Sequence, residues 1–176
     1  MQRTLKWLLV LGPVIVGAVG HVGSIQATPA SGFTASTLAV GRLPEFDVMH
    51  HAVFDDPDPT NSQKYVWLSM QKTKGLSDLY VQSNVWEPGG TTGWHTHPGH
   101  SLVTVTAGTV TNYDGDDPSC SPKVYTVGMT FVDHGGEHSH LVRNEGFIEA
   151  RTIAVQLIPA GATRRINAEA NPACPF

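Results

Sequence analysis

The sequence predicts an all-β domain of the sandwich or barrel type. The chain has 176 residues, of which 18 are glycine and 12 are proline, while 15% are charged and 40% are apolar. This composition is typical of many short strands joined by tight turns, and it supplies enough apolar side chains for one core. Segments rich in β-branched and aromatic residues recur about every 8 to 12 residues, with no amphipathic helix evident after residue 27.

The expected strands follow one another from residue 36 to residue 166. Lys72–Gly75 is predicted to be a turn, and Pro88–Gly90 is predicted to break the chain after a strand. The acidic segment at 54–61 (FDDPDPTN) lacks the alternating oxygen ligands of a calcium loop, so we interpret it as a solvated turn. Strands are expected around 36–40, 63–70, 77–87, 101–113 (a pair that bends at 107–108), 123–133 (a pair around Gly128), 140–144, 149–159 and 164–166.

The first 27 residues have the order of a secretory signal peptide. Arg3 and Lys6 precede an apolar run at 7–20, and a segment of small residues follows it. Cleavage is expected after Ala27, or alternatively after Ala30. The alternative is an uncleaved anchor, but the run is shorter than the roughly 20 residues that span a bilayer. The chain is therefore expected to be secreted or periplasmic, without a stable membrane span after cleavage. The expected organisation is a signal peptide at 1–27, a lead-in with the first strands at 28–62, a barrel at 63–160 and a tail at 161–176.

Charge and cysteine content narrow the functional class. Cleavage after Ala27 removes two of the 11 basic residues and none of the 15 acidic ones, which leaves a net charge of 9 − 15 = −6. A nucleic-acid partner is not expected, because phosphate binding requires clustered Lys and Arg. Cys120 and Cys174 are the two cysteines. In an oxidising compartment they predict one disulfide, with a reactive or metal-binding thiol pair as the alternative.

Histidines are concentrated in one part of the chain. Six of the nine lie between residues 95 and 140, and they include the pairs His95/His97 and His138/His140. Residues i and i+2 of a strand project from the same face, so the imidazoles of one pair can reach one ion at about 2.0 to 2.2 Å. The pattern predicts a site for a divalent transition metal such as Fe, Mn, Zn, Ni or Cu. Alternatively, these histidines are exposed or hydrogen-bonded within turns.

The residues around the first pair resemble a known sequence motif. In the first cupin motif, a glycine is followed after five residues by His-x-His, and later by a glutamate and a second glycine. Gly89, His95, His97 and Gly108 fit these positions. Ser101 stands where the motif has its glutamate, so a carboxylate ligand is missing.

The segment from Gly128 to Asn144 resembles the second cupin motif, which ends in His, three residues and Asn. His140 and Asn144 fit that ending. The segment is one residue longer than the motif, and residues 133–136 (DHGG) replace its Pro-x-Gly. Together the two motifs, within residues 77–158, resemble the cupin superfamily. The resemblance implies a cupin-type double-stranded β-helix, or jelly-roll barrel, with a metal bound by His95, His97 and His140.

The departures from the motifs leave alternatives open. We favour His140 over His138 as the third ligand because of its spacing to Asn144. His138 would then be a fourth ligand or a neighbour of the ligands. His100 is expected to point away from the ion or to lie in a turn, with replacement of the missing glutamate as the alternative. Trp94 is expected in the core or in the wall of the site.

Two functional hypotheses follow, with a third of less weight. The first is a metal-dependent enzyme of the cupin dioxygenase type that acts on a small molecule, since three protein ligands leave positions open for substrate. The second is an exported module that binds a metal or small ligand without turnover, because no general base is evident and Glu87 and Glu137 are interpreted as surface charges. The third is a structural barrel without metal. The sequence does not give the oligomeric state, but cupin barrels often pair edge to edge, which protects exposed strands, so the resemblance is compatible with a homodimer.

Overall fold

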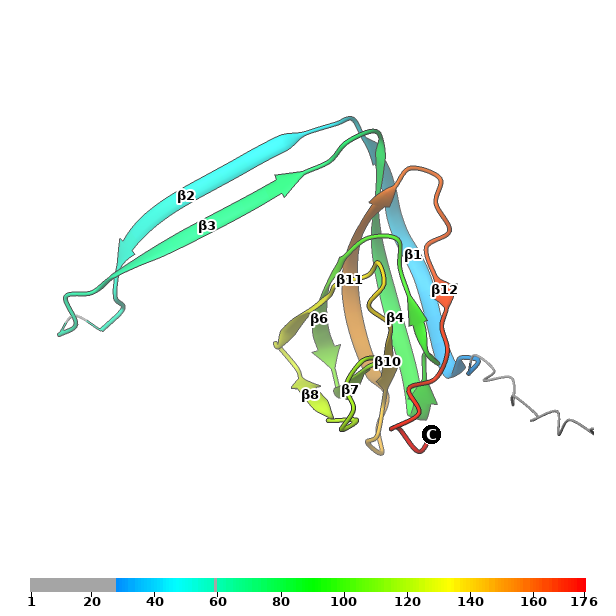
Figure 1. Cartoon of the computed structure of the whole chain (residues 1–176). Helices are drawn as coiled ribbons and strands as arrows, with labels where there is room; N and C mark the ends of the chain where they lie inside the picture. The colour runs from blue at the N-terminus through cyan, green and yellow to red at the C-terminus, as the bar shows by residue number, and fades with distance from the viewer. Residues whose placement is uncertain (1–27, 59) are drawn as a thin grey trace, which may run out of the picture.

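A computed structural model describes residues 28–58 and 60–176, and these residues form an all-β fold (Figure 1). The predicted signal peptide at 1–27 lies outside the described residues. Ten strands form one antiparallel sheet that closes almost completely into a barrel, and β2 and β3 form a separate pair. The strands are β1 (Ser31–Leu43), β2 (Asp47–Asp55), β3 (Lys64–Lys72), β4 (Ser77–Thr91), β5 (His95–Thr96), β6 (Ser101–Ala107), β7 (Thr109–Asp114), β8 (Lys123–Thr126), β9 (Thr130–Asp133), β10 (His140–Arg143), β11 (Ala150–Pro159) and β12 (Ile166–Asn167).

The pairing of the strands gives the barrel two halves. One half has the order β1-β4-β11-β6-β9, and the other has the order β12-β5-β10-β7-β8. The halves are joined where Arg143 of β10 pairs with Thr91 of β4. This arrangement confirms the predicted all-β jelly-roll barrel of cupin type.

Alternation along the strands builds the interior of the barrel. In β11, Ala150, Thr152 and Ala154 are buried while Arg151 and Val155 are exposed, because neighbouring residues of a strand project from opposite faces. β6 alternates in the same way, and the two strands pair directly. The buried apolar cluster draws on several strands: Trp86, Val103, Val105, Val110, Phe131, Val142, Ala150 and Ala154.

The turn between β6 and β7 shows why the sequence bends at Gly108. Its φ is +65°, and a Cβ there would lie 2.6 Å from the carbonyl oxygen of Glu149. Only glycine combines this backbone conformation with so close an approach. The predicted bends at 107–108 and around Gly128 both occur between strands.

The expected break at Pro88–Gly90 is wrong, because β4 continues to Thr91. The partners change from Phe33↔Trp86 to Ser31↔Thr91, so β4 advances further than β1 over this stretch. A β-bulge therefore accommodates the proline and the glycines within the strand. Residues 28–45 also contain more strand than the short segment expected there, because β1 pairs with β4 along nearly its whole length.

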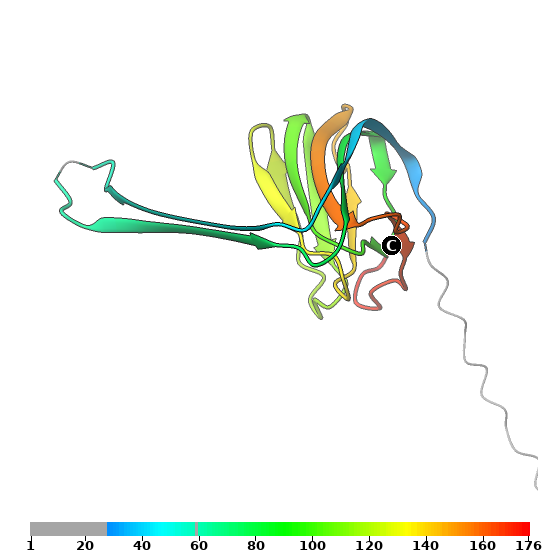
Figure 2. The same cartoon turned by 90° about the horizontal axis from the view of Figure 1, so that it is seen from above.

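The hairpin of β2 and β3, which we call the arm (47–72), projects away from the barrel (Figures 1 and 2). The acidic segment at 54–61, interpreted as a solvated turn, lies at its far end: Phe54 and Asp55 end β2, and the described residues 56–58, 60 and 61 lie between β2 and β3. Ion pairs close both ends of the paired strands: Lys72 with Asp47, and Lys64 with Asp55. The sequence alone did not predict β2 or its separation from the barrel.

The C-terminal tail is fixed to the barrel. Cys120 and Cys174 form the predicted disulfide, at a sequence separation of 54. The Asn171 amide donates hydrogen bonds to the carbonyl oxygens of Asp114 and Asp117, at 3.1 and 2.7 Å. Within residues 28–58 and 60–176, no helix is long and apolar enough to cross a membrane.

Candidate metal centre

Three short strands place two histidines side by side. His140, the first residue of β10, pairs directly with His95 of β5, and Asn167 of β12 pairs with His95 from the other side. His97 follows β5 immediately, two residues after His95. Histidines far apart in the sequence therefore meet because the register of β5 and β10 brings their backbones together.

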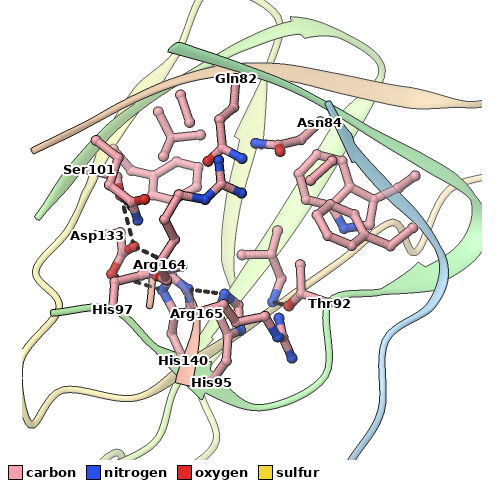
Figure 3. A pocket seen from close by; sticks show the side chains of 18 residues that line it. Gln82, Asn84, Thr92, His95, His97, Ser101, Asp133, His140, Arg164 and Arg165 are labelled. Atoms are coloured by element: carbon pink, nitrogen blue, oxygen red, sulfur yellow. Dashed lines mark hydrogen bonds and ion pairs between the residues drawn. The ribbon is translucent and has the colours of Figure 1, made fainter. Parts of the chain in front are cut away.

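The ligand atoms of His95, His97 and His140 lie within 4.8 Å of one another. Figure 3 shows the three side chains gathered at one end of the cavity. The Nε2 atoms of His95 and His140 are 3.1 Å apart. Two nitrogens bound to one ion at about 2.1 Å lie about 3.0 Å apart for an octahedral angle and about 3.4 Å for a tetrahedral one. The observed separation fits binding of one ion by both rings.

Hydrogen bonds at Nδ1 fix the tautomers. The Nδ1–H of His95 donates to the carbonyl oxygen of Gly93 at 2.9 Å, and that of His97 donates to the carbonyl oxygen of Arg164 at 2.5 Å. His140 directs Nδ1 toward Oδ1 of Asp133, at 3.4 Å. His97 faces acceptor oxygens from both ring nitrogens, since its Nε2 lies 3.2 Å from Oδ2 of Asp133. Carbonyl and carboxylate oxygens only accept, so the proton of His95 and of His140 belongs on Nδ1, and Nε2 of each keeps its lone pair. Two lone pairs 3.1 Å apart repel unless a cation lies between them.

Burial keeps two of these rings neutral. It lowers the pKa of His95 well below its ordinary value, and the nearby His140 and Arg165 lower it further. Burial also lowers the pKa of His140 from 6.5 to about 4, against the opposing effect of Asp133. Neutral imidazole is the form that binds metal, so at neutral pH no proton has to be displaced from these rings.

Asp133, the last residue of β9, supplies a carboxylate that the sequence analysis missed. It is 3% exposed, and Oδ2 lies 3.2 Å from Nε2 of His97. Asp133 pairs across the strands with Ser101, the residue at the glutamate position of the first motif, and accepts a hydrogen bond from its hydroxyl at 3.3 Å. The carboxylate is thus present on the neighbouring strand. Alternation along 130–133 could have indicated it, because the apolar Phe131 faces inward and Asp133 shares its face.

Other histidines considered from the sequence lie outside this group. His138 lies 3.6 Å from Oδ1 of Asp114 and 3.7 Å from Oδ1 of Asp116, measured from its two ring nitrogens. The ring of His134 stacks edge-on near that of His138. His100 lines a separate hollow at the base of the arm.

Trp94 and Asn144 have structural positions near the site. Trp94 is completely buried and packs with Tyr113 and Leu141 in a second apolar cluster, so it belongs to the core. The amide of Asn144 donates to the carbonyl oxygens of Glu87 and Ile148, at 3.1 and 2.7 Å. Asn144 therefore connects β4 to the loop that follows β10. His140 is the first residue of β10.

A cavity with an empty volume of about 600 Å³, part of it open to solvent, extends from the three histidines into the barrel. Its apolar walls include Phe33, Trp86 and Phe131. Arg164 and Arg165 also line it (Figure 3). Apolar walls with a few polar side chains are typical of a site for a small molecule.

The donor set fits a divalent transition metal. Three imidazole nitrogens converge, two of the rings are kept neutral by burial, and a carboxylate is adjacent. Imidazole suits Zn, Cu, Fe and Ni, so the donors alone do not select among them. The barrel has the cupin-type double-stranded β-helix fold, and the two histidine motifs lie within it.

Comparison with known proteins is limited to solved structures, since no protein-family model and no curated protein matches the chain. An oxalate oxidase is similar at 22% identity over 47% of this chain and 46% of its own, with a TM-score of 0.40. An uncharacterized protein with a double-stranded beta-helix domain from Klebsiella pneumoniae has 20% identity over 52% of this chain and 76% of its own, with a TM-score of 0.44. A predicted oxalate decarboxylase from Thermotoga maritima has 18% identity over 48% of this chain and 83% of its own, with a TM-score of 0.39. The match spans less than half of the oxalate oxidase.

Proposed function

We propose that this chain is an exported cupin-type protein that holds one divalent metal ion through the Nε2 atoms of His95, His97 and His140. The observation that carries the proposal is the facing pair of Nε2 atoms of His95 and His140, 3.1 Å apart, in rings that direct Nδ1 toward an acceptor. The third ring lies in the same group. When bound, the metal would supply Lewis acidity toward a ligand in the cavity.

Export is part of this proposal. The sequence at 1–27 has the order of a signal peptide, and the Cys120–Cys174 disulfide is typical of an oxidising compartment. We place cleavage after Ala27, ahead of β1, the first strand of the barrel sheet. An uncleaved 1–27 that anchors the chain is the alternative.

Three protein ligands favour a site that takes a small-molecule ligand over a closed cage. Zinc sites with three protein ligands keep a position for water or substrate, whereas structural sites are filled by four. His138 contacts Asp114 and Asp116 instead of joining the three histidines, and the cavity adjoins their free side. A metal-dependent oxidoreductase of the dioxygenase type is therefore the leading enzymatic hypothesis. A metal- or ligand-binding module without turnover is the alternative.

Metal analysis of the purified protein tests the proposal. We expect one zinc or iron ion per chain in the wild type, and a loss of most bound metal in His95→Ala and in His140→Ala. His134→Ala and His138→Ala are matched controls, because both histidines are nearby but lie outside the three-His group. Equal metal content in all four variants would contradict the site.

Oxygen uptake separates the two functional alternatives. The iron(II)-loaded protein, prepared without oxygen, is mixed with thiols, diketones and phenolics in turn. Uptake that disappears in His140→Ala supports the enzyme. A fully iron-loaded sample that consumes no oxygen with any of these compounds supports the binding module.

A further inference from the structure

The cavity beside the three histidines contains two arginines from the segment between β11 and β12. The carbonyl of Arg164 accepts the hydrogen bond from Nδ1 of His97, and Asn167 pairs with His95 two residues after Arg165. The backbone that carries both guanidinium groups is therefore fixed directly to two of the three histidines.

Arg164 is held by neutral groups. Its Nη1 donates to the hydroxyl of Thr37 at 2.9 Å, and its guanidinium lies 4.8 Å from the ring centre of Tyr80. With its amide oxygen turned toward Arg164, Gln82 accepts from Nη1 and Nη2, at 2.8 and 2.6 Å. These contacts position the guanidinium inside the cavity but leave its charge uncompensated (Figure 3).

Arg165 is half-buried beside His95 and has an ion pair with no residue in the part of the chain that the structure describes. Its Nε–H donates to Oδ1 of Asn167 at 3.2 Å. Burial lowers the pKa of Arg165 from its ordinary value. A buried charge is costly unless it is paired, so this position favours a ligand that brings the opposite charge.

The charges around the cavity are unequal. Among its described lining residues, Arg164 and Arg165 face one acidic residue, Asp133. Asp133 lies against His97 and His140, and among the described residues it makes an ion pair with neither arginine. A divalent metal on the three histidines would add further positive charge and would be repelled by Arg165 until an anion entered.

We infer that the cavity binds a small organic anion, with a carboxylate held by Arg165 and the rest of the molecule directed toward the three-His group. The fork of an arginine matches a carboxylate in two parallel hydrogen bonds. The contact with Arg165 stands on its own, and the approach to a metal rests on the function proposed above.

Calorimetric titration with malonate tests this inference, with malonamide as the neutral analogue of similar shape. Both compounds are added to the mature protein, once without metal and once loaded with zinc. We expect malonate to bind about tenfold or more tightly than malonamide in both forms, and more tightly still with zinc. Equal binding of the two compounds, or no binding of either, would overturn the inference.

Variants of Arg165 test whether this residue binds malonate. Arg165→Met should weaken malonate binding about tenfold or more, while Arg165→Lys should retain part of it. Arg151→Met is the control, because Arg151 is an exposed arginine on the outside of β11 that pairs with Glu149. Thermal unfolding of each variant shows that it folds. Unchanged malonate binding by a folded Arg165→Met would contradict the assignment.

The same titrations separate this inference from the metal proposal. Zinc bound at one ion per chain without any malonate binding overturns the anion site and supports the metal site. Malonate binding that depends on Arg165, in a chain that takes up no zinc, supports the anion site and overturns the metal site.

A second observation concerns the arm (47–72). Its cross-strand pairs Met49↔Met70 and Val53↔Val66 lie on one face with Leu68, because they are separated by even numbers of residues. Met70 is 72% exposed and Val66 is 65% exposed. An isolated two-stranded hairpin is marginally stable in water, so an apolar arm of this kind needs a covering surface.

The exposed apolar side chains of the arm fit a second copy of the chain. They lie on both faces, and those on the opposite face include Phe54, Tyr65 and Trp67. The arm has two lysines and four aspartates, so its net charge of 2 − 4 = −2 comes from Asp56 and Asp58 beyond the two ion pairs. A complementary apolar surface exists on the outside of the barrel, where Leu102 lies opposite both Val132 and Val155.

We propose that the arm of each copy packs against the barrel of another copy in a two-fold homodimer. Sedimentation of the mature protein should give the mass of a dimer, and Val66→Lys combined with Met70→Lys should give a folded monomer. Ile148→Lys, which changes an exposed apolar residue on a different loop, should leave the dimer intact. A monomeric wild type, or a dimer that survives both arm substitutions, would overturn the proposal and direct attention to another partner for the arm.

Discussion

Asp133→Asn tests whether the carboxylate of Asp133 in β9 raises the metal affinity of the three-His group. The wild-type Oδ1 faces Nδ1 of His140 at 3.4 Å, and Oδ2 lies 3.2 Å from Nε2 of His97. An asparagine whose oxygen stays at the Oδ1 position keeps the hydrogen bond from the backbone N–H of Gly135, at 3.2 Å. Its amide NH₂ then takes the Oδ2 position and donates to the Nε2 lone pair of His97, which the metal requires.

The size of the effect follows from these contacts. Replacing a carboxylate that supports a metal-binding histidine costs about ten- to hundredfold in affinity, or about 1.4 to 2.7 kcal/mol. The competing hydrogen bond to His97 acts in the same direction, so we expect the upper part of this range for Asp133→Asn. Zinc affinity is measured by competition with a chromophoric chelator, and thermal unfolding of the metal-free protein establishes that the variant is folded.

Asp116→Asn is the matched control. Asp116 also lies beside a histidine, at 3.7 Å from Nδ1 of His138, but outside the three-His group. Its zinc affinity should equal that of the wild type. A folded Asp133→Asn that binds zinc as tightly as the wild type would refute the reasoning, because neither the orientation of His140 nor the lone pair of His97 would then depend on Asp133.

Three further predictions concern the stability of the barrel. Replacing both Cys120 and Cys174 with serine should lower the free energy of unfolding by about 4 kcal/mol, because the disulfide closes a loop across 54 residues, and denaturant titration of the oxidised wild type and the variant measures the difference. The metal-free protein should lose stability as the pH falls from about 6.5 toward about 4, because His140 takes up a proton in the unfolded chain at a higher pH than it does when buried, where its pKa is about 4. Urea titrations should show a loss of about 2 kcal/mol between pH 7 and pH 5 from this residue alone. A free energy of unfolding that stays constant or rises over this range would contradict the pKa shift. Asn144→Ala should cost about 2 to 4 kcal/mol, because it leaves the carbonyls of Glu87 and Ile148 without their amide donor. Gln63→Ala, which removes an exposed amide, is the control, and a thermal shift of Asn144→Ala no larger than that of Gln63→Ala would contradict this role.

The sequence predicted those features that depend on local pattern. Alternation and turn residues located most strands of the barrel, and the motif ending at Asn144 favoured His140, whose partner in β5 the structure then identified as His95. Features that depend on register between distant segments were missed. β2 reads as a poor strand because both of its faces are exposed, and the bulge at Pro88–Gly90 becomes visible only against β1.

The missing glutamate of the first motif illustrates the same limit more sharply. Along the chain, Ser101 removes a carboxylate, and nothing near it in sequence restores one. Across the sheet, Ser101 lies opposite Asp133. This level of the barrel therefore has one carboxylate, which stands on β9 and not at the motif's glutamate position on β6. From β9 the carboxylate contacts His97 and His140, and the three-His group is made without it. Part of the charge of a bound divalent ion is thereby offset through the histidines, and Arg164 and Arg165 remain without an acidic partner among the described lining residues. Because Asp133 lies against the histidines and against neither arginine, the cavity keeps the unpaired positive charge that the proposed anion site requires.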